Sequence, residues 1–251
     1  MADHELEPLL DYLMLAPPHF PPASTTRTPN TTSDAYSWKN ITSVGHWPEF
    51  TCSQIMQHYG TLLQSAQIAS QPMPDTPLQP VKTEVDLACR YYAYLHPRLR
   101  RALRAAFHHL VPQLANLHLT PLAIDGGKEL TDILFFDAVG MPDTSPSRCV
   151  GIIKVSWKWG SDWGTSEVEE KRIEYRQVLS EIDFYMKRHG ARYGFVLTDV
   201  ELVPLKRLDE YGNVLVARAI PWETRGPGRL TILLGMWYLA MLEADDDDWR
   251  V

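Results

Sequence analysis

The chain has 251 residues and is 45% hydrophobic, so it is long enough and apolar enough to build a sizeable packed core. Its apolar runs stay shorter than the roughly 18 residues that span a bilayer, and we expect no membrane association. Cys52, Cys89 and Cys149 are dispersed without a CxxC pair, which argues against a disulfide framework and a structural zinc site. The first residues lack a basic start followed by an apolar block, so we expect an intracellular protein, nuclear or cytoplasmic.

The formal net charge of −7 is unevenly distributed along the chain. Residues 1–81 contain two Lys/Arg and seven Asp/Glu, whereas residues 82–242 contain 21 Lys/Arg and 19 Asp/Glu. The mildly basic middle is compatible with a phosphate-bearing partner such as nucleic acid but does not require one. The chain closes with an acidic tail, residues 245–251, which we expect to be solubilising.

The N-terminal third is rich in Pro, Ser and Thr, a composition that buries too little apolar surface to offset the entropy of ordering. We therefore expect residues 1–80 to form a largely disordered arm. Within it, apolar residues at helical spacing predict one short helix in 51–69. Four prolines in 71–80 indicate a linker to a folded domain over 81–244.

The folded domain begins with a helix, because Thr83 followed by Asp86 is a capping signal. A long second helix starts at Thr165 or Ser166 and ends before Gly190. The last helix, 229–244, is apolar on all sides and must pack against something. Strands are predicted at 117–124, 131–138, 149–159, 192–198, 201–208 and 214–220. This order predicts an α/β fold with a mixed central sheet flanked by helices.

The strand at 149–159 carries a lysine in the middle of an apolar run. Because strand side chains alternate between faces, Lys154 shares one face with Ile152 and Ser156, while Ile153 and Val155 lie on the other. A lysine at such a position needs water at the strand end or a polar cleft.

The order helix, three strands, long helix, strand resembles the PD-(D/E)XK nuclease superfamily. Asp132 lies on the second strand, Lys154 on the third, and Glu84 on the leading helix. The segments GIIKVSWKW, 174–203 and VARAIPW are similar to nuclease-like domains found in fungal proteins, and the resemblance covers about 82–242. It implies a restriction-endonuclease-like core and phosphodiester hydrolysis, as in a DNase, that depends on Mg²⁺ or Mn²⁺.

The resemblance also implies roles for individual residues. Asp132 supplies a metal-binding carboxylate, and the backbone carbonyl of Ile153 can be a further ligand. Lys154 positions the attacking water or stabilises developing charge, and Glu84 assists from the leading helix. On the long helix, Gln177 corresponds to a residue that contacts nucleic acid in related nucleases.

The chain departs from the family motif at Ile152, which stands where the motif has a metal-binding Glu. Three outcomes follow from this departure. The site can be inactive, leaving a non-catalytic interaction or scaffold module that acts through protein partners. A carboxylate from the long helix can replace the missing one, with Glu167, Glu170 and Glu174 as candidates. Alternatively, the remaining acids, Asp132 and Glu84, hold the metal on their own.

A basic stripe on the leading helix is a second candidate for contact with nucleic acid. Arg98, Arg101, Arg104 and His108 recur at helical spacing. They form either a phosphate-contacting surface or an ordinary solvated helix face.

Overall fold

The computed structural model describes residues 5–21, 30, 33–74, 79–110, 148–244 and 250–251, together with the backbone of residues 117–122 and 132–137. These residues form a mixed α/β fold around a mixed eight-stranded sheet, as the sequence predicts. The strand order is β2-β9-β8-β7-β6-β5-β4, and β10 pairs with β8. The strands are β2 (Ser43–His46), β4 (Leu117–Leu122), β5 (Asp132–Asp137), β6 (Cys149–Ile153), β7 (Tyr193–Leu197), β8 (Glu201–Arg207), β9 (Asn213–Val216) and β10 (Ile220–Pro221).

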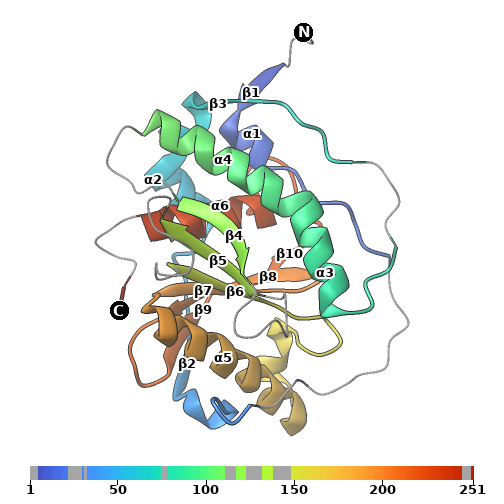
Figure 1. The fold of residues 1–251 in the computed structure, drawn as a ribbon, viewed down its shortest axis with the longest axis vertical. Helices are drawn as coiled ribbons and strands as arrows, with labels where there is room; N and C mark the ends of the chain where they lie inside the picture. Colours follow the sequence, from blue (N-terminus) through green and yellow to red (C-terminus); the bar gives the residue numbers. More distant parts are fainter. Residues whose placement is uncertain are drawn as a thin grey trace.

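Helices cover both faces of this sheet (Figure 1). On one face lies the long helix α5 (Glu169–His189), with the short helices η1 (Trp38–Asn40) and η3 (Ser161–Thr165) beside it. The other face carries α6 (Ile232–Ala244), which contacts β6, β7 and β8. Outside α6 lie α1 (Leu9–Leu13), α2 (Cys52–Ser65) and α4 (His96–His109), and α3 (Glu84–Arg90) leads into α4 through η2 (Tyr91–Leu95).

Strands β4, β5 and β6 form an antiparallel meander, after which α5 crosses over so that β7 runs parallel to β6. Side-chain alternation along β6 sends Val150 and Ile152 into the core cluster under α5, and Cys149 and Ile153 into the cluster under α6. The predicted separation of Ile152 and Ile153 onto opposite faces is therefore confirmed.

Helix α6 is apolar around its whole circumference, and its environment explains why. Almost every residue from Ile232 to Ala244 is buried, because the sheet covers one side and α1 and α4 cover the other. At its start, Thr231 Oγ1 donates to the carbonyl of Leu13 at 2.5 Å and accepts from Leu234 N at 3.1 Å. This N-cap fastens the C-terminal helix to the N-terminal arm.

The structure differs from the expected disorder of residues 1–80. Leu9, Tyr12 and Leu13 of α1 are fully buried in the main core, and β2 pairs in parallel with β9 as a strand of the central sheet. A small sheet of β1 (Leu6–Pro8) and β3 (Gln67–Ala69) and the predicted short helix, which is α2, complete the described arm. The composition of residues 1–80 predicted too little ordered structure, because apolar side chains of this segment are buried against α6.

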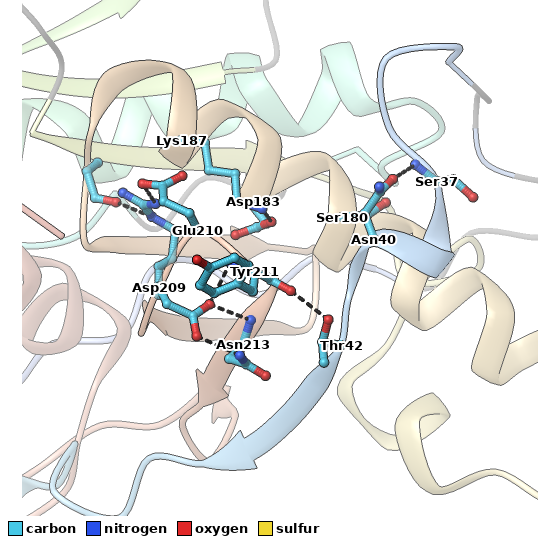
Figure 2. Close-up of polar contacts among 12 residues, drawn as sticks. Ser37, Asn40, Thr42, Ser180, Asp183, Lys187, Asp209, Glu210, Tyr211 and Asn213 are labelled. Atoms are coloured by element: carbon cyan, nitrogen blue, oxygen red, sulfur yellow. Dashed lines mark hydrogen bonds and ion pairs between the residues drawn. The ribbon is translucent and has the colours of Figure 1, made fainter.

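A second set of polar contacts holds the β2 edge. Figure 2 shows Thr42, just before β2, donating its hydroxyl to the carbonyl of Tyr211 in the β8–β9 turn, at 2.6 Å. In the same turn, Asn213 Nδ2 donates to Asp209 at 2.6 Å. Gly212 lies between them with a positive φ of 81°, a conformation that favours glycine.

Two predicted boundaries need correction. The third strand ends at Ile153 instead of reaching Trp159, because the chain turns at residues 156–158. The long helix begins at Glu169, and the earlier residues form η3. It ends before Gly190 as predicted, with that glycine at a φ of 69°. Residues 245–249, the larger part of the expected acidic tail, lie outside the described residues.

Candidate functional site

Lys154 lies at the carboxyl end of β6. Its backbone N–H donates to the carbonyl of Leu197 at 3.0 Å, which extends the parallel pairing of β6 and β7 by one residue. The chain then turns, and the backbone N–H groups of Lys158 and Trp159 both donate to the carbonyl of Val155. Lys154 is therefore held on a rigid strand end, on the α5 face of the sheet.

The ammonium of Lys154 contacts a carboxylate from α5. Its Nζ lies 3.0 Å from Oε1 and 2.8 Å from Oε2 of Glu181, and both side chains are 11% exposed. An ammonium that contacts both oxygens of a nearly buried carboxylate forms a charge-assisted pair. Removing either group would leave the other charge buried without its partner, which costs free energy. The polar partner that the sequence leads us to expect for Lys154 is thus the carboxylate of Glu181, and Lys154 lies at the strand end instead of mid-strand.

Glu181 is not among the site residues predicted from the sequence. Its signal was an acid between Val178 and Ile182 of α5, which are both fully buried. An acid at such a position needs a cationic partner, and Lys154 was the lysine in the sheet that needed an anion.

Asp132 is brought to the strand next to Lys154. The register of β5 on β6 pairs Asp132 with Ile152, two residues before Lys154. The backbones of the predicted acid and lysine are therefore neighbours, as the resemblance requires. The side chain of Asp132 lies outside the described residues, so the convergence of the two groups stays a prediction.

Position 152, where the resemblance implies a Glu, is occupied by a packed apolar side chain. Ile152 is 1% exposed and belongs to the core cluster under α5, as does Val196 on the adjacent β7. Position 152 therefore offers no metal ligand, and hydrocarbon fills the space around it.

The other predicted acids make contacts of their own. Glu84 Oε1 pairs with Lys158 Nζ at 2.9 Å, and Glu174 Oε2 accepts from Asn30 Nδ2 at 2.6 Å. Glu167 and Glu170 are exposed near the start of α5. Among the described side chains, no group of three His, Cys, Asp or Glu is arranged to hold a metal ion. The carboxylate that α5 sends to Lys154 is thus Glu181, and none of the three candidates named above.

The predicted basic stripe on α4 is not a continuous surface. Arg98 is 2% exposed; its guanidinium donates to the carbonyl of Gln71 and lies over the Tyr12 ring, 4.9 Å from the centroid. Burial lowers the pKa of Arg98 from its usual value. Arg101 donates to the carbonyl of Ala69 at 2.8 Å, which leaves Arg104 as the exposed arginine of the predicted three.

Gln177 has a structural contact as well. It is 8% exposed, and its Oε1 accepts from the backbone N–H of Trp38 at 2.9 Å. This bond holds η1 against α5.

Two further acids lie at the edge of the sheet where β7 ends and β8 begins. Asp199, just after β7, accepts from the backbone N–H and the hydroxyl of Ser156 at 2.7 and 2.9 Å. Glu201 accepts from the same two groups of Ser161 at 2.7 and 2.9 Å. Both acids fix the loop between β6 and α5, and sequence analysis passed over them because neither belongs to a local motif.

No family model, no curated protein and no solved structure matches this chain. Within the described part of the chain, no helix is long and apolar enough to cross a membrane.

Proposed function

We propose that this chain is a PD-(D/E)XK nuclease-like protein that binds and cleaves phosphodiesters at a site made of Asp132, Lys154 and Glu181. The observation that carries the proposal is the Lys154–Glu181 pair at the end of β6, one strand away from the Asp132 backbone. The helix, the antiparallel meander, the crossover helix and the parallel strand supply the same order of elements as the superfamily.

The donor set suits a hard divalent cation such as Mg²⁺ or Mn²⁺, which prefers oxygen ligands. The carboxylates of Asp132 and Glu181 and the carbonyl of Ile153 would hold it. An ionised carboxylate has about four lone-pair sites, so Glu181 can keep its contact with Lys154 and still offer oxygen to a cation. When bound, the metal supplies Lewis-acid catalysis and lowers the pKa of a coordinated water.

The remaining chemistry belongs to the side chains. Glu181 orients the Lys154 ammonium, which donates a hydrogen bond to the attacking water or to a phosphate oxygen where negative charge develops. Because Lys154 is on a strand end and Glu181 on a long helix, neither group has to be ordered when substrate binds.

The test is metal-dependent cleavage of single- and double-stranded DNA and RNA by the full chain. We expect cleavage with Mg²⁺ or Mn²⁺ that is lost in Asp132→Ala and in Glu181→Gln. Glu174→Gln is the matched control, because it removes an acid of the same helix that bonds to Asn30 instead of Lys154. Cleavage that persists in both site variants would show that the activity comes from elsewhere.

A second candidate function is a non-catalytic interaction module on the same fold. The burial of Ile152 favours it, because an apolar side chain stands where the family needs a carboxylate. Thermal unfolding with and without Mg²⁺ separates the two functions, since a cation that binds only the folded state raises the melting temperature. A module predicts no shift in the wild-type chain and no cleavage. Ile152→Glu, which places a charge in an apolar cluster, should then be rescued by Mg²⁺ only if the remaining ligands are in place.

A further inference from the structure

A cavity lies beyond the carboxyl ends of β6 and β7. Its volume is about 660 Å³, and it is lined by residues 19–21 of the arm, by Ser156 and Trp157 after β6, by Asp199 and Val200 after β7, and by residues 221–223. Small-molecule sites in sheets with parallel strands are common at this position, and typical ligand pockets have about this size.

Aromatic side chains form the walls. Phe20 packs on Trp222 with ring centroids 4.8 Å apart, and the Trp222 indole donates from Nε1 to the carbonyl of Pro18 at 3.1 Å. These contacts fix the arm as one side of the cavity. Trp157 also lines the cavity and is half-buried.

The charges around the cavity are mainly negative. Asp199 is held by Ser156, and Glu223 lies at the exposed rim, where it pairs with His19. None of the described lining residues is Lys or Arg. The two acids, Asp199 and Glu223, therefore give the cavity a negatively charged lining.

We propose that this pocket binds an organic cation, an alkylated ammonium or a guanidinium group. Aromatic faces attract such cations through their quadrupole, and a fixed carboxylate adds directional attraction. The alkyl groups of the cation would pack against the aromatic rings that line the cavity, and its positive charge would lie near the carboxylate of Asp199. A phosphate or nucleotide is disfavoured here because two carboxylates would repel it.

The inference does not rest on the nuclease proposal. Lys154 points to the α5 face, whereas Phe20, Trp222 and the packing side of Trp157 belong to the core cluster on the α6 face. An inactive module can carry this pocket as readily as a nuclease can.

The experiment measures binding to the full chain by calorimetry. Choline is the cationic probe, and 3,3-dimethyl-1-butanol is its neutral counterpart of nearly equal shape. We expect choline to bind about tenfold more tightly than the alcohol, a difference of about 1.4 kcal/mol that is within the range of a desolvated cation–π contact. Equal affinity for the two probes, or no binding of choline at millimolar concentration, would overturn the proposal.

Variants locate the site. Asp199→Asn keeps an oxygen acceptor for Ser156 and removes the charge, and Trp157→Leu keeps apolar volume and removes the ring. Each should weaken choline binding about fivefold to tenfold. Tyr211→Leu is the control, because this aromatic is 78% exposed on the β8–β9 turn and does not line the cavity. Unchanged binding in both pocket variants, or an equal loss in the control, would contradict the assignment.

A further set of titrations, with peptides as ligands, distinguishes a free small cation from a basic side chain of a protein. Short peptides that differ only in a central lysine, trimethyllysine or norleucine are titrated into the chain. Tighter binding of a cationic peptide than of choline, with norleucine inactive, identifies a basic side chain of a protein as the ligand. The reverse order identifies a free small cation.

Discussion

The ion pair between Lys154 and Glu181 makes a quantitative prediction about stability. The Nζ lies about 2.9 Å from the two carboxylate oxygens, and at an effective dielectric constant of about 20 this separation gives an attraction of about 6 kcal/mol. Both side chains are 11% exposed, so most of that attraction is offset by the desolvation of two charges. Removing one partner leaves the other charge buried, and each of Lys154→Met and Glu181→Leu should cost about 3–5 kcal/mol.

The double variant is the decisive measurement. With both charges replaced by apolar side chains of similar size, no buried charge remains, and we expect the double variant to be less destabilised than either single one. Urea unfolding of the four proteins gives the coupling free energy, which should be about 3 kcal/mol or more.

A parallel cycle on Glu84 and Lys158 serves as the control. That pair has a similar separation of 2.9 Å but side chains about 21–22% exposed, so its coupling should be smaller, about 1 kcal/mol. If the Lys154–Glu181 coupling were below about 0.5 kcal/mol, or no larger than the control, the reasoning from burial would be refuted.

Other predictions concern the arm, two carboxyl groups and one glycine. Leu13→Ala should lower the free energy of unfolding by about 3–5 kcal/mol because Leu13 is fully buried. Leu6→Ala, at a residue 62% exposed, should lower it by less than about 1 kcal/mol. Equal small effects of the two variants in urea unfolding would show that the arm is disordered after all. Burial raises the pKa of Asp183, so the folded chain holds this proton more tightly than the unfolded chain does. Urea midpoints measured across pH should therefore show the wild type losing stability relative to Asp183→Asn as pH rises from the ordinary carboxyl pKa through the raised one. The hydrogen bond from the Asn213 side chain lowers the pKa of Asp209 (Figure 2). The wild type should therefore lose stability relative to Asp209→Asn as pH falls below the ordinary carboxyl pKa. A pH dependence of the same sign for the Asp183 and Asp209 variants would contradict these assignments. Gly151→Ala should destabilise by about 2–3 kcal/mol or more, seen as a lower thermal midpoint, because a Cβ there meets an aromatic ring of β7; an unchanged midpoint would mean that this contact relaxes freely.

Local patterns in the sequence predicted much of the fold. Strand alternation separated Ile152 from Ile153, glycine at 190 ended the long helix, and helical spacing located α2 within 51–69. These features depend on neighbours within a few residues, which is why a single sequence is sufficient to find them.

The end of the third strand was not predictable in this way. The apolar and aromatic run continues to Trp159, so alternation alone extends the strand. In the structure the chain turns after Val155, and Trp159 stacks on Tyr175 of α5 with ring centroids 5.7 Å apart. The position of the Trp159 ring is set by its packing against α5. This tertiary contact overrides the two-residue alternation that predicts a longer strand.

The order of the arm was also a tertiary outcome. Its composition is polar and rich in proline, and average composition decides whether a segment can form a core of its own. It does not decide whether a few residues such as Leu9 and Leu13 can complete a core that other segments have built. The apolar circumference of α6 was the clue, because a helix of that kind must be covered on every side.

The sequence by itself determined the order of the main helices and strands after residue 80, the unusual lysine at position 154 and the isoleucine at position 152, where the resemblance implies a glutamate. Only the tertiary structure decided that the partner of Lys154 is Glu181, 27 residues away on α5. Local periodicity tells which side chains share a face of one element. The partner across two elements depends on how the helix is rotated and placed on the sheet, and that placement is set by the packing of the whole core.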